Sequence, residues 1–229
     1  MPGKRAAPSI WMRREHTGVG RPARRSRGEI TAAALAIADS EGLEAVSMRR
    51  VAAELGTGPA SLYRYVETRD ELLDLMTDAT AAEYALAEPS GDWLADLVAI
   101  GEQARAIMRR HSWLAGLVTT RPVIGPNGVM LLEHALAVLA SHPADIAAKL
   151  EAFAMLNGIT ALFVLQELAG ASDVQHRNAA YLWHLASSGD HPRLARLLSQ
   201  GGSGEGVADG HDPADRYRDI IARILTGLL

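Results

Sequence analysis

The sequence predicts an all-α protein, and three observations support this prediction. Aromatic residues make up only 5% of the 229 residues, whereas Ala and Leu, which favour helices, are plentiful. No stretch alternates apolar and polar residues with the period of two that a half-buried strand shows. Apolar residues recur instead at helical spacing, and 48% of the chain is hydrophobic, which is ample for a core. We therefore expect helices and no sheet.

The charges divide the chain into a basic first part and an acidic remainder. Residues 1–69 hold 12 Lys and Arg against 7 Asp and Glu, whereas residues 70–229 hold 11 against 20. The net charge of −4 conceals this asymmetry. A basic end joined to an acidic body is typical of a protein that binds nucleic acid with one part only, because phosphates repel the other.

Residues 1–26 are expected to form a basic, disordered arm, because prolines and glycines interrupt every regular pattern there. Two interpretations of this arm stay open. It is either a solvated tail or a segment whose cations neutralise phosphates or enter a minor groove beside the main site. No apolar segment of the kind found in secretory signals follows the basic residues.

Two helices are predicted between residues 27 and 55. The first spans 27–40 and is ended by Gly42, since glycine commonly caps the carboxyl end of a helix. The second follows Ser47, a residue type favoured as an N-cap. Its apolar stripe consists of Met48, Val51, Ala52 and Leu55.

A third helix is predicted at 59–66, directly after a glycine turn at residues 56–58. Pro59 is favoured at a first helical position, because its missing N–H would have had no intrahelical partner. Only Leu62 and Val66 are obvious apolar anchors, so most of the surface of this helix is polar or aromatic. Two short helices joined in this way form a helix-turn-helix. The second of them, at 59–66, can lie in a major groove.

The residues from Ala60 to Leu73 resemble the DNA-binding domain of the tetracycline repressor (TetR) family. The shared pattern is a small and a polar residue, then Leu-Tyr, an aromatic two positions later and a basic residue before Leu-Leu. Here these positions read Ala60-Ser61-Leu62-Tyr63, Tyr65, Arg69 and Leu72-Leu73, with arginine where the family usually has lysine. The resemblance implies a three-helix DNA-binding domain, which we call the head, at residues 27–72.

The head offers candidates for two kinds of DNA contact. The family places a guanine contact at the position of Arg49. The alternative interpretation is that Arg49 is a surface arginine without a role in binding. Pro59 and Ala60 could touch thymine methyl groups, while Tyr63, Tyr65 and Arg69 suit phosphates. The ring of Tyr65 could instead pack on the next helix. The full predicted set is Arg49, Thr57, Pro59, Ala60, Ser61, Tyr63, Arg64, Tyr65 and Arg69.

Residues 73–229, which we call the body, are predicted to be helical. Apolar stripes and caps indicate helices at 69–86, 93–111, 112–117, 129–140, 144–168, 179–186 and 213–228. Two prolines and two glycines indicate a loop at 121–128, and a glycine-rich connector is expected at 199–206. The connector lacks the Lys-Ser/Thr ending of a phosphate-binding loop.

The run from Arg110-His111-Ser112-Trp113 through Arg121-Pro122 to Gly125-Pro126-Asn127 resembles the C-terminal domain of tetracycline repressors. The resemblance implies that the body binds a small-molecule effector and forms homodimers. Apolar pockets with a few polar groups are typical of such sites, although the same side chains could simply form a core. The predicted effector set is Met108, Trp113, Leu117, Phe153, Leu156, Asn157, Thr160, Phe163 and Gln166.

No metal or other cofactor is expected. In tetracycline repressors a histidine and a glutamate hold a drug-bound magnesium, but Leu117 and Gln166 occupy the matching places here. The eight histidines are scattered and form no His-Glu-x-x-His pair, and cysteine is absent. No catalytic residues are predicted, because Gly-x-Ser-x-Gly and cofactor fingerprints are missing as well.

The helices at 144–168 and 213–228 are expected to build a four-helix bundle across a two-fold axis, so the protein would bind an inverted repeat. The longest uncharged run, residues 152–166, is too short to span a bilayer, and a buried core helix is the better interpretation. A cytoplasmic protein is expected. The leading hypothesis is an effector-released repressor. The alternatives are a helical DNA-binding protein without an effector, and an enzyme with an incidental helix-turn-helix.

Overall fold

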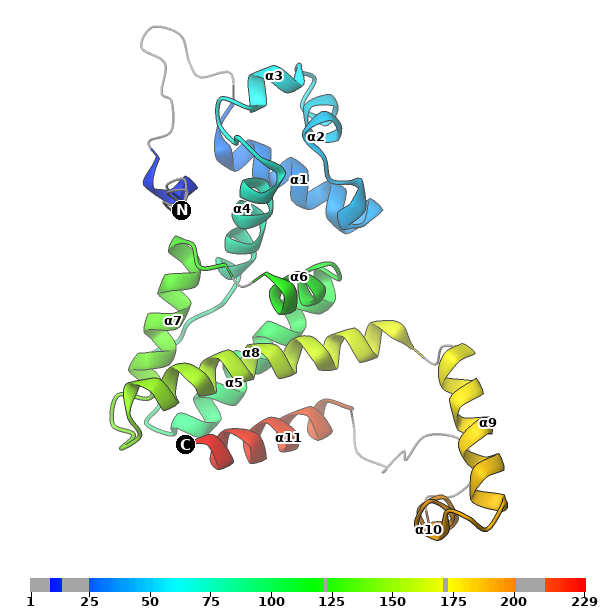
Figure 1. The fold of residues 1–229 in the computed structure, drawn as a ribbon. Coiled ribbons are helices and arrows are strands. Elements are labelled where there is room, and N and C mark those ends of the chain that lie inside the picture. Colours follow the sequence, from blue (N-terminus) through cyan, green and yellow to red (C-terminus); the bar gives the residue numbers. More distant parts are fainter. Residues whose placement is uncertain (1–8, 14–24, 122, 171–172, 201–212) are drawn as a thin grey trace, which may run out of the picture.

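The computed structural model describes residues 9–13, 25–121, 123–170, 173–200 and 213–229, and all of its regular elements are helices. The prediction of an all-α fold is therefore confirmed for the described residues. In Figure 1 the head stands at the top, and the body lies below it as crossing helices. The head contains α1 (Arg27–Glu41), the 3₁₀ turn η2 (Leu43–Ala45), α2 (Met48–Glu54) and α3 (Pro59–Leu62). Helix α4 (Arg69–Ala81) descends from the head into the body.

The body is built from α5 (Trp93–Arg110), α6 (Leu114–Thr120), α7 (Pro126–Val138), α8 (Ile146–Ala169) and α11 (Pro213–Leu228). Helix α8 packs against α5 and α6, and α11 packs along α5 and α8. Two further helices, α9 (Asp173–Ser187) and α10 (Pro192–Gln200), extend away from the rest of the body and pack against each other (Figure 1).

One face of α11 belongs to the core of its own chain. Tyr217, Ile221 and Leu225 are buried at successive helical turns. The Tyr217 ring lies so close to α5 that a Cβ at Gly101 would approach its hydroxyl oxygen to 2.7 Å, so this crossing requires glycine. The helix at 213–228 is predicted to lie at a dimer interface. Its residues Tyr217 and Ile221 are instead covered by packing within the chain.

Several predicted boundaries shift for identifiable reasons. Helix α4 ends at Ala81 rather than near residue 86, because the Gln103 side chain takes over both backbone groups of Ala85, at 2.7 Å to its N–H and 3.2 Å to its carbonyl. Helix α7 starts earlier than predicted, with Pro126 at its first position. Helix α10 was not predicted, although Leu194, Leu197 and Leu198 have helical spacing. Most of the predicted connector lies outside the described residues.

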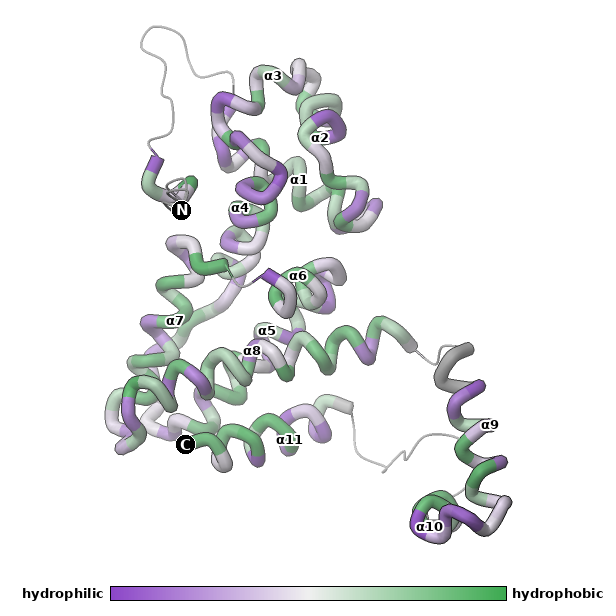
Figure 2. The backbone as a smooth tube through the Cα atoms, in the orientation of Figure 1, coloured by the Kyte–Doolittle hydropathy of each residue, from purple (hydrophilic) through white to green (hydrophobic). Residues whose placement is uncertain are grey.

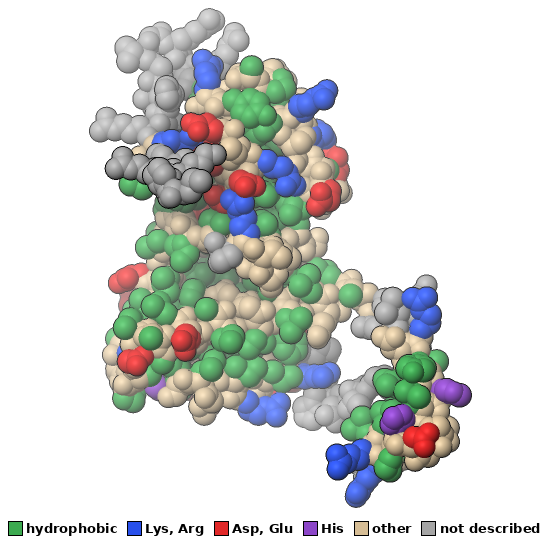
Figure 3. Space-filling view, in the orientation of Figure 1, with side chains coloured by type: hydrophobic (Ala, Val, Ile, Leu, Met, Phe, Trp, Pro, Cys, Tyr) green, Lys and Arg blue, Asp and Glu red, His purple; other side chains and the backbone are tan. Residues whose placement is uncertain are grey.

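Helix α8 is the one element in the described part that is long and apolar enough, by length and composition, to cross a membrane. Only 28% of the most apolar 18-residue stretch of α8 is buried. The tube in Figure 2 shows the apolar character along α8, and Figure 3 shows hydrophobic side chains gathered on the exposed face of the body. The expectation of a buried core helix therefore holds for one side of α8 only, because its other side is not covered by any described residue.

Residues 9–13 lie inside the arm that the sequence predicts to be disordered, but they have a defined place. They form the 3₁₀ turn η1 (Ile10–Met12), with the Ser9 side chain accepting a hydrogen bond from the Trp11 backbone N–H. Ile10 is buried in the core that head and body share. The prediction missed this turn because its anchoring contacts are with residues distant in sequence.

Candidate DNA-binding surface and effector cavity

The turn between α2 and α3 is shaped by local hydrogen bonds. Ser47 caps α2 by accepting from the Arg50 backbone N–H. At the other end, the Thr57 N–H donates to the Ala52 carbonyl at 2.9 Å and the Gly56 N–H donates to the Ala53 carbonyl at 3.0 Å. This paired arrangement requires a left-handed residue, and Gly56 supplies it with φ of 62°. The helix-turn-helix geometry is therefore encoded within the turn itself.

Most of the predicted DNA-contacting side chains share one property, which is exposure. Arg49 and Arg64 are exposed and form no ion pair with any described residue. The neighbouring Arg50 differs, because Glu41 and Glu54 hold its guanidinium. The exposed members of the predicted set are Arg49, Pro59, Ala60, Tyr63, Arg64 and Arg69.

Four members of the predicted set also make contacts inside the head. Tyr65 is buried in the head core, which matches the alternative of a packing ring. Arg69 donates through Nε to the Val46 carbonyl at 3.0 Å and through Nη2 to the Leu43 carbonyl at 3.1 Å. Arg69 thus holds the segment that leads into α2.

The other two of these residues are Ser61 and Thr57. The Ser61 hydroxyl donates to the Gly58 carbonyl at 2.7 Å. Thr57 must then be the donor in the 2.8 Å contact between the two hydroxyls, because Ser61 has no second proton. Both hydroxyls stabilise the start of α3.

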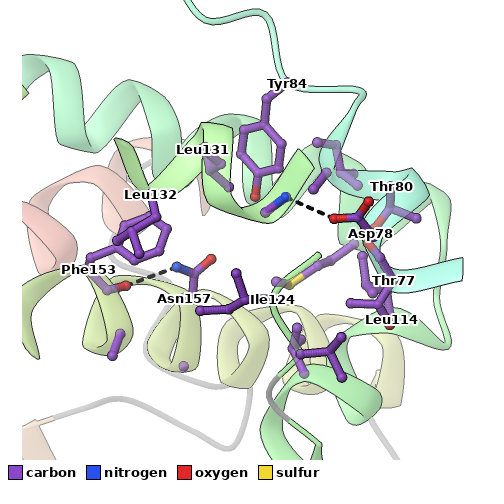
Figure 4. A pocket seen from close by; sticks show the side chains of 18 of the residues that line it. Thr77, Asp78, Thr80, Tyr84, Leu114, Ile124, Leu131, Leu132, Phe153 and Asn157 are labelled. Atoms are coloured by element: carbon purple, nitrogen blue, oxygen red, sulfur yellow. Dashed lines mark hydrogen bonds between the residues drawn. The ribbon is translucent and has the colours of Figure 1, made fainter. Parts of the chain in front are cut away.

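A cavity of about 490 Å³ lies in the body beneath the head. Its walls come from α4, α5, α6, α7, α8 and the segment between α6 and α7, as Figure 4 shows. Most lining side chains are apolar. Ile124 and Leu150 line it and are also exposed to solvent, so the cavity reaches the surface between the α6–α7 segment and α8. A volume of this size suits an organic molecule of several rings.

A few polar groups face this apolar space. The Thr77 hydroxyl is buried and has no hydrogen-bond partner among the described residues. Asn157 donates through Nδ2 to the Phe153 carbonyl at 2.9 Å, which leaves its amide oxygen available. Burial raises the pKa of Tyr84 above its usual value, so this hydroxyl stays neutral. An unpartnered buried hydroxyl is costly, so the site favours a guest that offers it a partner.

Asp78 also lines the cavity, but its carboxylate is occupied. It accepts from the Gly128 backbone N–H at 3.0 Å and from Asn127 Nδ2 at 3.0 Å, and so caps the first turn of α7. Because a helix amino terminus favours a negative charge, this contact ties α4 to α7. The labelled side chains in Figure 4 include Asp78 beside Thr77 and Thr80.

The predicted effector residues fall into three groups. Met108, Phe153 and Asn157 line the cavity. Leu156, Thr160 and Phe163 do not. Thr160 and Phe163 face α11, since the Thr160 hydroxyl is 2.7 Å from the Tyr217 hydroxyl and the Phe163 ring packs edge-on against that of Tyr217, and Leu156 lies beside Gly101 of α5. Helical spacing alone could not tell these two faces of α8 apart.

The remaining three predicted residues also lie outside the cavity. Trp113 and Leu117 are buried where the body meets the head, and Gln166 is exposed. The prediction is therefore wrong for the lining role of six residues. It missed the contribution of α4, whose Thr77, Asp78 and Thr80 are polar positions within an otherwise apolar stripe.

Trp113 links the body to the head instead of lining the cavity. Its Nε1 donates to Asp39 Oδ1 on α1 at 2.7 Å. His111 Nδ1 lies 2.8 Å from the same oxygen, and His111 Nε2 lies 2.8 Å from Glu83 Oε1. These contacts join α1, the end of α4 and the end of α5. His111 is thus a hydrogen-bond partner of both carboxylates, and no group of His, Asp or Glu side chains in the described ranges could hold a metal ion.

Two family models cover most of the chain. Residues 30–76 match the bacterial regulatory proteins of the tetR family, and residues 87–228 match the tetracycline repressor-like C-terminal domain. An HTH-type transcriptional regulator of Saccharopolyspora erythraea is 32% identical over 214 residues, which are 90% of this chain and 85% of that protein.

Two further similarities are to a transcriptional repressor and to a regulator that was solved with bound ligands. The repressor DrrR1 of Streptomyces coeruleorubidus is 46% identical over 112 residues, a match that covers 48% of this chain and 42% of DrrR1. The TetR family protein ActR of Streptomyces coelicolor, in complex with (S)-DNPA, has a TM-score of 0.75 and 33% identity, covering 90% of this chain and 97% of ActR. Another ActR structure holds actinorhodin. Because both parts of the chain match models of one family, this chain belongs to the TetR family and is a DNA-binding regulator of transcription.

Proposed function

We propose that this chain is a repressor that leaves a palindromic operator when a small, mainly apolar molecule enters the cavity of the body. The observation that carries the proposal is the position of α4. This helix starts directly after the recognition helix α3, and its Thr77 and Asp78 form part of the cavity wall. A ligand that displaces α4 therefore also displaces the DNA-reading surface. ActR, whose structures contain bound small molecules, supports the same arrangement by similarity.

The cavity indicates the chemical class of the effector. Its apolar lining favours an uncharged molecule of several rings, since burying a charge without a partner is costly. The Thr77 hydroxyl requires an acceptor, and the Asn157 oxygen can receive a donor. The effector should therefore carry oxygen atoms, both as carbonyl and as hydroxyl groups. No metal is needed, because both Asp78 oxygens already accept hydrogen bonds from α7.

A homodimer is part of this proposal, and the outer face of α8 supports it. Met155, Leu162 and Leu165 are exposed along that face, and Leu228 of α11 is also exposed. So much apolar surface on one helix is unfavourable in water unless another surface covers it. A two-fold dimer would present two copies of α3 to half-sites related by the same symmetry, and hence to an inverted repeat. Binding to the bacterial chromosome implies a cytoplasmic location.

The test starts with binding-site selection, which should return an inverted repeat. Small molecules are then screened for release of that DNA, beginning with actinorhodin and (S)-DNPA and adding the matched pair 1-hydroxyanthraquinone and anthracene. The proposal expects an oxygen-bearing ring compound to release the DNA at lower concentration than anthracene. A single asymmetric DNA element would contradict the dimer, and a protein that nothing releases would favour a DNA-binding protein without an effector.

Thr77→Val sharpens this test because it removes only the hydroxyl. The unliganded variant should be as stable as the parent or more so, since an unsatisfied buried hydroxyl costs about 1–3 kcal/mol. It should bind the DNA normally but need more of the oxygen-bearing effector for release. Thr119→Val is the matched control, because the Thr119 hydroxyl already donates to the Gly116 carbonyl at 2.9 Å. Equal effects of both substitutions would show that Thr77 does not contact the effector.

A further inference from the structure

The segment of residues 9–13, which we call the strap, crosses from the head to the body. Its first anchor is Ile10, which is 2% exposed and packs into the core shared by head and body. The neighbouring Met12 is 79% exposed and makes no comparable contact. The strap is therefore held by particular side chains rather than by non-specific apolar contacts.

Polar contacts fasten the strap to the head. Arg27 Nη1 donates to the carbonyls of Ile10 and Arg13, at 3.0 Å each. The Arg13 guanidinium pairs with Glu67 and Glu71, which stand at the start of α4. Both sets of contacts come from residues close to the recognition helix. The strap must accordingly move with the head.

The remaining side chain of the strap contacts the body. A Cβ at Gly125 would lie 2.6 Å from Trp11 Cζ2 and 2.5 Å from Asp78 Oδ1, so the indole and the carboxylate meet over this glycine. Gly125 is the N-cap of α7, and Asp78 both caps that helix and lines the cavity. Figure 1 shows η1 beside α4 and above the start of α7.

We propose that the strap locks the head against the first turn of α7, so that Trp11 couples the orientation of the recognition helix to the wall of the cavity. When the head tilts, Ile10 and Arg13 carry Trp11 away from Gly125, and the contact is lost. When α7 or Asp78 shifts around a bound effector, the indole of Trp11 loses its contact with Gly125 and the head is released. The strap is thus a conformational restraint within one chain, beyond the operator and effector binding proposed above.

The first experiment measures head orientation without DNA or effector. The chain contains no cysteine, so spin labels can be attached at Ala53→Cys on α2 and Glu133→Cys on α7, two exposed positions. Labelled chains are diluted with unlabelled ones, and the distance distribution is recorded by pulsed electron resonance. Trp11→Ala should broaden the distribution, whereas the control Met12→Ala should leave it as in the parent. A distribution unchanged by Trp11→Ala would overturn the proposal.

The second experiment measures, by hydrogen exchange, the local stability of the first turn of α7, which the indole of Trp11 contacts. Loss of Trp11 should make the Gly128 amide, which donates to Asp78, exchange roughly tenfold faster, as a loss of about 1.4 kcal/mol of local stability would. Trp11→Leu serves if the alanine variant unfolds, because leucine stays apolar but cannot reach Gly125. Uniform acceleration over the whole chain would indicate global destabilisation instead and contradict the proposal. Neither readout depends on an effector, so failure of the effector proposal would leave this test intact.

Discussion

At the scale of single residues, the partners of an arginine decide what it can do. Arg49 and Arg50 are adjacent on α2, yet Arg50 is held by Glu41 and Glu54 while Arg49 is exposed and unpaired among the described residues. Of these two arginines, only Arg49 has all its donors available for a base edge. Arg69 lies between these cases, because its side chain is exposed but two of its donors already hold backbone carbonyls.

Arg49→Ala is therefore expected to cost about 1–3 kcal/mol of operator binding and to relax the preference at one base pair, as the loss of a bidentate guanine contact would. Arg50→Ala is the control and should leave base preference unchanged. Competition binding against operators with single substitutions measures both effects. Arg69→Ala should weaken all sequences alike, with a loss of head stability as well. Relaxed preference in the Arg50 variant would contradict these roles.

At the scale of elements, α8 has two apolar faces with different purposes. Ala152, Leu156 and Ala161 are buried against the rest of the body, whereas Met155, Leu162 and Leu165 are exposed. The inner face forms the core, and the outer face supplies the surface that we assign to the dimer. Helix α11 is less informative, because removing it would also remove Tyr217 from the core of each chain.

Leu162→Glu should therefore convert dimers to monomers without unfolding the chain. Leu162 is 53% exposed, so the carboxylate would be solvated in a monomer but buried and unpaired in a dimer. Tyr63→Glu is the matched control, because Tyr63 is 49% exposed but lies in the head. Analytical ultracentrifugation gives the oligomeric state and circular dichroism the helix content. Dimers of unchanged affinity in the Leu162 variant would place the interface elsewhere.

At the scale of the whole molecule, head and body share one core. Buried side chains of α1, α2 and α4 form a single cluster with Ile107, Met108, Trp113 and Leu117 of the body. Asp39 adds a polar link, because its Oδ1 accepts from Trp113 Nε1 at 2.7 Å and lies 2.8 Å from His111 Nδ1. A continuous core means that neither part can open without exposing apolar surface of the other.

We expect head and body to unfold together, in one calorimetric transition at a fixed protein concentration. Asp39→Ala should lower the free energy of unfolding by about 1–3 kcal/mol, because it leaves the indole N–H of Trp113 without its acceptor. The whole transition should shift as a unit. The neighbouring Ser40→Ala is the control, since the Ser40 hydroxyl bonds only to carbonyls of its own helix. A separate transition that moved alone in the Asp39 variant would show independent domains.

The sequence by itself determined the features that depend on neighbouring residues. Ser47 caps its helix as predicted, Asp92 caps α5 in the same way, and Gly56 forms the turn of the helix-turn-helix, because caps and turns use hydrogen bonds within a few residues. The start of α11 at Pro213 follows from the same local chemistry. Periodicity likewise identified the apolar helices of the body.

Only the tertiary structure decided which apolar surface serves which purpose. Thr160 and Asn157 are both polar residues of α8, yet one bonds to Tyr217 in the core and the other lines the cavity. Helical spacing places them near each other but cannot reveal what packs on either side. The same holds for Ile10 and Trp11, whose partners are far along the chain. A cavity is the space that packed helices leave unfilled, so its walls become known only when the helices are placed together.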